Sequence, residues 1–305
     1  MKYSKTPLTA EQHIGLLKSR GLEIPNEDRA KKYLNNIGYF RLTGYMYHLQ
    51  NKDGSHQFLD NITFNDIVVH YQFDKKLRAI VLEYLERIEV TLRARLTNCF
   101  SINYGFYWFT QYDLYDDKAI YASINEEIKA RFDAPQERFL KAFKFNYTSE
   151  RLPPSNMAME ILSLGKLSHL YKGLSNKIEK TTVATEFGLP STILSSWFIY
   201  LTNVRNICAH HSRLWNRKIT ADRPTIPTRP KYKFNGTLPD DFNTTMYGVV
   251  SMIDKLLSKI NAGNTFIVQI SKLIEYHPIV NSELMGFPND WKINAAWNSL
   301  SDDSG

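Results

Sequence analysis

Apolar residues recur every three or four positions along several segments of this chain, the spacing that gives an α-helix one apolar face. The longest such segment covers residues 74–98, and its apolar stripe consists of Leu77, Val81, Tyr84, Leu85, Ile88, Leu92 and Leu96. On the remaining surface Glu83 precedes Arg87 by four residues, and Glu89 precedes Arg93 by four, the order that stabilises a helix. The pattern therefore predicts a long helix with one buried and one solvated face.

Capping residues predict where shorter helices begin. Thr9 and Gln12 have the spacing of a capping box, and Gly21 is suited to close that helix. Asn26 precedes a second helix. Thr63, together with Asp66 three residues later, is suited to cap a helix that begins at residue 64. Further helices are predicted at residues 120–132, 156–164, 166–174, 246–260 and 265–276, with a break at Gly165 between the second and third of these.

One more apolar helix follows Pro190, a residue that the first turn of a helix tolerates. Its apolar face consists of Leu194, Trp197, Phe198, Leu201 and Val204. The face leads directly into residues 200–216, which read YLTNVRNICAHHSRLWN. No segment alternates between apolar and polar residues as a half-buried strand does. The expected fold class is therefore all-α, a helical bundle with additional N-terminal helices.

Residues 218–236 change in character, because three prolines are interleaved with basic side chains. The residues concerned are Pro224, Pro227, Pro230, Arg223, Arg229, Lys231 and Lys233. Proline lacks the backbone donor that helices need, so we predict a basic, extended loop rather than a packed element. We expect an N-terminal helical region over residues 1–62 packed on the core, a helical domain over 63–280 that carries the motif, and a tail over 281–305.

The composition is that of a globular protein, with 43% hydrophobic and 23% charged residues in a chain of 305. The formal net charge of +7 favours polyanionic partners such as nucleic acid. No run approaches the roughly 18 consecutive apolar residues that a spanning helix needs, and the N-terminus lacks the apolar core of a signal peptide. Cys99 and Cys208 are interpreted as buried thiols of a cytoplasmic protein.

The chemistry of residues 200–216 centres on Arg205, Asn206 and His210. Asn206 and His210 are four residues apart and share one helical face, while Arg205 is offset from Asn206 by about 100° but has a long stem. RNA breaks when a ribose 2′-hydroxyl attacks its own phosphorus. Histidine transfers protons near neutral pH, and a guanidinium stabilises the negative charge of the phosphorane. Asn206 can orient a phosphate oxygen or the imidazole, and no metal ion or other cofactor is needed.

Basic residues near the motif are candidates for contacts with flanking phosphates. Arg213, Arg217 and Lys218 follow it directly, and Arg87 and Arg93 lie on the charged face of the long helix. The alternative interpretation of that charged face is a solvated surface of ion pairs.

Structural roles are equally open for the motif. Arg205 can instead pair with a carboxylate, and His210 can cap the C-terminus of its helix, where a cation is favoured. Cys208, His210 and His211 suggest zinc, but no second Cys/His pair completes a structural site, so we expect no metal.

Residues 205–217, RNICAHHSRLWNR, resemble the signature of Abi-like proteins of the AbiD/AbiF type, which are associated with bacterial abortive infection and form a branch of the HEPN superfamily of helical ribonucleases. Similar stretches are GYFRLTGY at 38–45, FDKKLRAIVLEYLERIEVTLRARL at 73–96, LSLGKLSHLY at 162–171 and MGFPNDW at 285–291.

The resemblance implies a HEPN-like helical bundle and metal-independent ribonuclease activity. Arg205, Asn206 and His210 match the HEPN pattern of Arg, a polar residue and a later His, and His211 could share or replace the role of His210. In such proteins two motif copies face each other across a homodimer. Relatives also suggest a structured small RNA or an antitoxin as a partner.

Three hypotheses follow. The leading one is an endoribonuclease of anti-phage defence that acts on RNA at a composite dimer site, away from membranes. The main alternative is an RNA-binding module of the same fold that holds RNA, for example a cognate structured small RNA, without cutting it. The third is a structural interaction protein whose basic surface is incidental.

Overall fold

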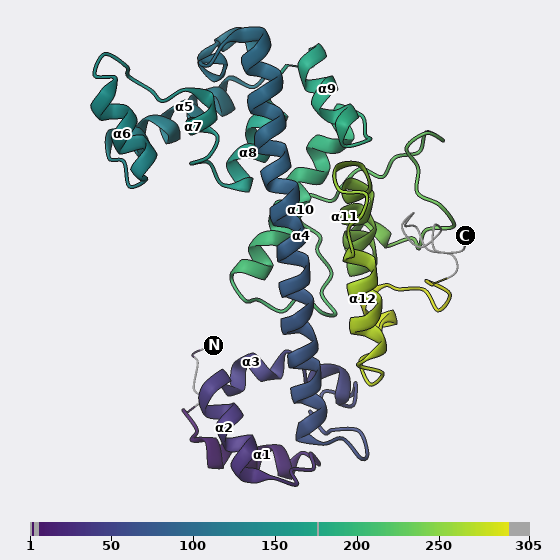
Figure 1. Ribbon diagram of the computed structural model, residues 1–305. Helices are drawn as coiled ribbons and strands as arrows, with labels where there is room; N and C mark the ends of the chain where they lie inside the picture. The colour runs from purple at the N-terminus through teal and green to yellow at the C-terminus, as the bar shows by residue number, and fades with distance from the viewer. Residues whose placement is uncertain (1, 3–5, 176, 293–305) are drawn as a thin grey trace. The chain divides into compact units, whose positions relative to one another are not determined.

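The computed structural model describes residues 2, 6–175 and 177–292. Throughout these ranges the regular structure is helical, with twelve α-helices and no β-strand beyond three isolated bridges (Figure 1). The predicted all-α fold class is confirmed. Within the same ranges, none of the helices has both the length and the apolar character required to cross a bilayer. The last part of the predicted tail, from residue 293, lies outside the described residues.

The chain divides into two compact units, one of residues 1–78 with 271–281 and the other of residues 79–270 with 282–305. This division does not follow the predicted boundaries at 62 and 280, because the helix that starts at Phe64 continues through residue 78. The N-terminal region at 1–62, the helical domain at 63–280 and the tail at 281–305 stay a prediction.

The first unit contains α1 (Ala10–Ser19), α2 (Glu27–Ile37), α3 (Tyr39–Thr43) and the short 3-10 helix η1 (Tyr47–Leu49). The predicted capping box is present, since Thr9 accepts a hydrogen bond from the Gln12 backbone (3.3 Å) and the Gln12 side chain accepts one from the Thr9 backbone (2.8 Å). Asn26 caps α2 by accepting from Arg29 N at 2.8 Å. Local capping chemistry was therefore sufficient to place these helix starts.

The long helix α4 (Phe64–Tyr104) begins at the predicted residue but is longer than the periodic segment predicted. Asp66 accepts hydrogen bonds from the backbone and hydroxyl of Thr63, at 2.8 and 3.0 Å. The helix ends where Gly105 takes a left-handed conformation with φ of +80°. All seven residues of the predicted apolar stripe are buried, so the periodicity identified the buried face of α4.

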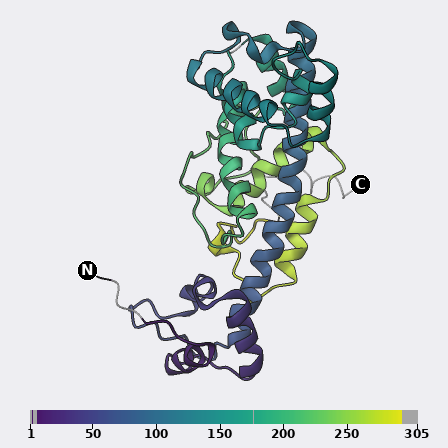
Figure 2. The same cartoon turned by 90° about the vertical axis from the view of Figure 1, so that its left-hand side faces the viewer.

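Two C-terminal helices, α11 (Met246–Ile260) and α12 (Phe266–Glu275), confirm the predicted helices at 246–260 and 265–276. Figures 1 and 2 both show the first half of α12 beside α4. There the Tyr84 ring packs on Phe266 at 4.9 Å, and its hydroxyl oxygen accepts a hydrogen bond from Gln269 Nε2 at 2.9 Å.

The remaining 3-10 helices are η2 (Trp108–Thr110), η3 (Tyr112–Leu114), η4 (Phe242–Thr244) and η5 (Glu283–Met285).

The middle of the second unit contains α5 (Lys118–Asp133), α6 (Arg138–Asn146), α7 (Ser155–Ala158), α8 (Leu164–Gly173) and α9 (Ile178–Glu186). The helix predicted at 156–164 is wrong, because α7 stops at Ala158 and the chain turns before Ser163 caps α8. Gly165 does not break a helix either. It lies in the first turn of α8, where an added Cβ would meet Thr202 Cγ2 at 3.4 Å, so the residue permits close packing.

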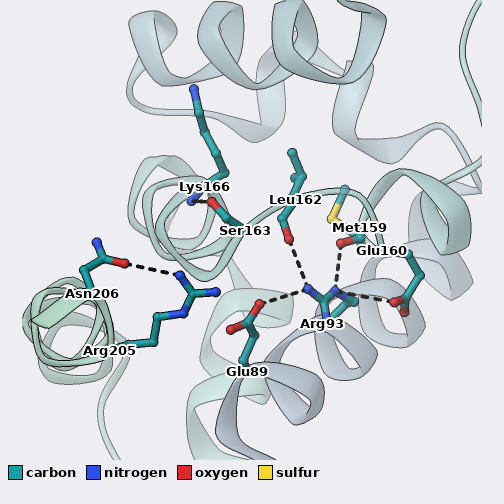
Figure 3. A network of polar contacts seen from close by, with 9 residues as sticks. All are labelled: Glu89, Arg93, Met159, Glu160, Leu162, Ser163, Lys166, Arg205 and Asn206. Carbon is teal, nitrogen blue, oxygen red and sulfur yellow. Dashed lines mark hydrogen bonds and ion pairs between the residues drawn. The ribbon is translucent and has the colours of Figure 1, made fainter. Parts of the chain in front are cut away.

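Arg93 ties the turn between α7 and α8 to α4 (Figure 3). Its Nε donates to the Met159 carbonyl at 2.8 Å, and its Nη2 donates to the Leu162 carbonyl at 3.0 Å and to Glu89 at 3.1 Å. Only 12% of the Arg93 side chain is exposed. Since buried carbonyls need donors, this arginine adds hydrogen bonds to a turn that is otherwise closed by the bond from Leu162 N to the Met159 carbonyl at 3.3 Å.

The helix that carries the motif is α10 (Ser191–Ala209), which packs on α8 and α9. Phe198 meets Tyr171 of α8 edge-on at 5.7 Å and Phe187, just after α9, at 5.4 Å. The five predicted apolar residues of α10 are all buried. The motif therefore extends from a helix that is held on several sides.

The basic loop over residues 218–236 lacks regular secondary structure, as predicted, but it is packed. Pro224 and Pro227 are buried, and the Phe234 ring stacks on Trp197 of α10 with centroids 5.7 Å apart. Trp197 Nε1 also donates to the Thr225 carbonyl at 2.8 Å. The prediction of an unpacked loop is wrong, because alternating apolar residues anchor the chain between its exposed cations.

The two ion pairs on α4 give a matched test of burial. We predict that Arg93→Ala lowers the free energy of unfolding by about 2–4 kcal/mol, because Glu89 and the buried Leu162 carbonyl lose a donor and the Met159 carbonyl keeps only its bond from Leu162 N. Arg87→Ala breaks an exposed pair with Glu83 of the same spacing and should cost less than about 1 kcal/mol. Urea denaturation of both variants measures the difference, and equal losses would contradict the structural role of Arg93.

Candidate functional site

The candidate site is built on the way in which α10 ends. His210 N donates to the Asn206 carbonyl at 2.9 Å, His211 N donates to the Cys208 carbonyl at 3.1 Å, and Ser212 N donates to the Ile207 carbonyl at 3.0 Å. These bonds form a Schellman motif, which satisfies the last carbonyls of a helix. Its left-handed position is usually occupied by glycine, but here it is His211, with φ of +54°.

Both histidines are exposed at this helix end. The turn directs the chain away from the axis of α10 just after His210, and Leu214 and Trp215, four and five residues after His210, are fully buried. The backbone around the imidazoles is thus fixed on one side by helical hydrogen bonds and on the other by packing. His210 also occupies the C-cap, so the capping interpretation describes its backbone, while its side chain is accessible to a polymer.

Arg205 projects from a different face of α10 than Asn206 and His210 but reaches the neighbouring amide. Its Nη1 donates to Asn206 Oδ1 at 3.3 Å, as the reach of its long stem led us to expect. Figure 3 shows the guanidinium on the side where Glu89 and Ser163 lie. Within the described ranges no carboxylate lies at ion-pair distance from Arg205, so its guanidinium is half-buried without a bound counter-charge.

Asn206 and His210 line a pocket of about 380 Å³ at the end of α10. The other lining residues are Asn203, Ile207, Ser212, Arg217, Lys218, Ile219, Thr220 and Ala221. Several of them, including His210, Arg217 and Lys218, are exposed, so the rim of the pocket is open to solvent. Arg205 is outside this lining and meets the pocket only through its contact with Asn206.

The basic residues that follow the motif lie at the same place. Arg217 and Lys218 form part of the pocket rim, and Arg217 Nη1 donates to the Arg213 carbonyl at 3.4 Å. Lys218 forms an ion pair with Asp241, so the ammonium group of Lys218 lies beside that carboxylate. Arg213 is half-buried and outside the pocket lining. Two of these three candidates therefore share a cavity with His210.

Arg87 and Arg93 on α4 are outside the pocket. The donors of Arg93 are used by two carbonyls and Glu89, which gives it a structural role. Arg87 is more exposed, with its guanidinium bound to Glu83 at 2.8 Å and over the Tyr84 ring at 4.6 Å. Arg93 is therefore a structural residue and not part of the candidate site.

Two further residues border the motif and were not among the sequence candidates. Asn203 lies three residues before Asn206 and seven before His210, so the helical period already placed it on their face. Asp222 accepts a hydrogen bond from Asn203 Nδ2 at 3.0 Å. No sequence signal pointed to Asp222, because its position depends on the path of the basic loop.

Other polar groups near the motif have packing roles. Burial raises the pKa of the Tyr200 phenol well above its ordinary value, and the side chain is fully buried, so it is not available for proton transfer. Among the residues that the structure describes, no group of three or more His, Cys, Asp and Glu side chains is placed to hold one metal ion.

The family model for Abi-like protein matches residues 32–216, which is more than half of the chain and includes the whole of α4, α10 and the motif. The chain therefore belongs to the Abi-like protein family. Comparison with curated proteins and with solved structures gives no match.

The left-handed residue at the end of α10 offers a test of the turn. We predict that His211→Gly raises the free energy of unfolding by about 1 kcal/mol, because glycine adopts positive φ without steric cost. His211→Val should lower it, since a β-branched residue is strained there. Thermal and urea denaturation measure both effects. A valine variant as stable as the glycine variant would contradict the described turn.

Proposed function

We propose that this chain is a metal-independent endoribonuclease of the HEPN type that acts in cytoplasmic, anti-phage abortive-infection defence. The observation that carries the proposal is the shared, solvent-open pocket of Asn206 and His210, with Arg217 and Lys218 on its rim and Arg205 bonded to Asn206. Membership of the Abi-like family supports the role in abortive infection.

In the proposed reaction the imidazole of His210 transfers a proton. The ribose 2′-hydroxyl gives up its proton, its oxygen attacks phosphorus, and the bond from phosphorus to the 5′-oxygen breaks as that oxygen gains a proton. The products are a 2′,3′-cyclic phosphate and a 5′-hydroxyl. A group that titrates near neutral pH can serve either proton transfer.

The guanidinium of Arg205 stabilises the negative charge that develops on the phosphoryl oxygens. Asn206 accepts from Arg205 through Oδ1, which fixes the amide and leaves its Nδ2 donors for a phosphate oxygen or the His210 ring. His211, exposed beside His210, can assist or replace it. Arg217 and Lys218 neutralise the adjoining phosphates, and Arg213 and Arg87 are candidates for more distant ones.

Strand cleavage needs both a base and an acid, and this chain carries one motif of this kind. We propose that two chains form a homodimer in which the exposed ends of two α10 helices face each other across the RNA. A symmetric dimer presents the same surface twice, so identical residues supply both proton transfers. A structured small RNA is a further candidate partner that could restrain the site.

The activity is tested with purified protein, RNA and the 2′-deoxy analogue of the same sequence, in the presence of EDTA. We predict cleavage of RNA alone, and a decrease of about 100-fold or more in His210→Ala, the range that general acid–base catalysis contributes. Arg205→Lys should also lose most activity, because a lysine cannot form paired hydrogen bonds. His169→Ala, which removes an exposed imidazole from α8, is the matched control and should cleave normally.

The same assay separates the alternatives. Cleavage that survives in His210→Ala, or that requires a divalent ion, would contradict the proposed mechanism. RNA binding without cleavage would favour the non-catalytic RNA-binding module. Neither binding nor cleavage would favour the structural interaction protein.

The composite site is tested by co-expressing tagged wild-type chains with His210→Ala chains. If both histidines of a dimer act in one site, activity should follow the square of the wild-type fraction, about a quarter at equal expression. Autonomous chains would give a linear decrease, to about half, and would contradict a shared site. Sedimentation analysis of the same samples establishes whether dimers are present.

A further inference from the structure

The pocket at the end of α10 is larger than the cleavage chemistry alone requires. Its volume of about 380 Å³ lies at the lower end of the range for small-molecule sites, roughly 300–1,000 Å³, whereas the reaction needs room for one phosphate group. Asn203, Asn206 and His210 line one wall in succession along α10, and Ile219, Thr220 and Ala221 line the loop side. The space between these walls can receive a further part of the nucleotide.

Asn203 contributes a polar group whose orientation is fixed. An ionised carboxylate only accepts hydrogen bonds, so the amide of Asn203 must turn its Nδ2 toward Asp222. The two atoms are 3.0 Å apart. The carbonyl oxygen Oδ1 consequently lies on the opposite side of the amide, and a flip would place it against the carboxylate, which also only accepts hydrogen bonds. A fixed acceptor can select between ligands, which a rotating amide does far less well.

Asp222 holds this amide from a constrained part of the loop. Its backbone has φ of +49°, in the left-handed region that aspartate tolerates better than most residues. The segment on either side is anchored, since Ile219 N donates to the Thr244 carbonyl at 2.9 Å and Pro224 is buried. The carboxylate is thus carried by the loop and not by α10, and its bond to Asn203 links these two segments beside the pocket.

The remaining surface suits a nucleobase. Ile207 and Ala221 offer apolar contact, and a planar amide offers an in-plane hydrogen bond at the same pocket. Proteins recognise unpaired RNA bases by this combination of apolar contact to the ring and hydrogen bonds to its edge. Arg217 and Lys218 on the rim are placed for the phosphate that connects such a base to the cleaved one.

We propose that this pocket is a base-recognition subsite, in which Asn203 contacts the edge of the unpaired base next to the cleaved bond and Asp222 is its positioning residue. The inference rests on the proposed ribonuclease function and adds substrate selectivity to it. Asn203 takes no part in proton transfer, so its loss should change which RNAs are cut more than how fast a favoured RNA is cut.

The test is cleavage of a randomised single-stranded RNA pool, with the cut positions read by sequencing. We expect the wild-type protein to prefer one base, by about tenfold, at a single position beside the cut, in line with the discrimination that a good amide–base contact gives. Asn203→Ala should abolish that preference while cleavage continues, and Asp222→Ala should weaken it at the same position. Asn103→Ala, which removes an exposed asparagine from α4, should retain the wild-type profile.

Each outcome bears on the proposal. A preference that persists unchanged in both Asn203→Ala and Asp222→Ala, or a wild-type protein that cuts without preference, would overturn the subsite and leave the ribonuclease intact. Absence of cleavage by the wild-type protein would overturn the ribonuclease, and the subsite with it. Circular dichroism of Asn203→Ala checks its fold. If Asn203→Ala is unstable, Asp222→Ala tests the orientation of the same amide through a change in the loop.

Discussion

The structure of the site depends on the left-handed turn that ends α10. Because His211 N and Ser212 N bond back to the last turn, the helix stops at a fixed residue, and the chain then enters the core at Leu214 and Trp215. A helix that continued for one more turn would carry His211 and the residues after it around its axis and would prevent residues 217–221 from lying opposite Asn203 and Asn206. The backbone strain at His211 therefore accompanies the geometry that creates the pocket.

The rigidity of this turn comes from the packing of α10. Phe198 and Trp197 fix the helix against α8, α9 and the basic loop, while Arg93 secures the turn that precedes α8. The cations at the pocket are consequently carried on anchored segments. Two arginines of one unit thus have different surroundings, because Arg93 is buried and donates to carbonyls whereas Arg217 is exposed on the rim of the pocket.

Capping residues and helical period were sufficient to predict α1, α2, the start of α4 and α11, because those signals are local. Gly165 misled the prediction, since its role is contact with Thr202, 37 positions away in the sequence. The helix α9 was missed because β-branched threonines give it weak propensity, and only its tertiary contacts specify it. The helical period of α10 likewise predicted that Asn206 and His210 lie on one face. The contact between Asn203 and Asp222 could not be predicted, because it depends on the path of the loop in the folded protein.

The chemical ends of the cleaved RNA report directly which oxygen attacks phosphorus. Products that are formed by the wild-type protein and lost in His210→Ala should carry 2′,3′-cyclic phosphates and 5′-hydroxyls, because the ribose oxygen is the nucleophile. Mass spectrometry of the released fragments distinguishes these ends from all others. Fragments with 5′-phosphates and 3′-hydroxyls would show that water attacked from the other side, and would contradict the mechanism assigned to Arg205, Asn206 and His210.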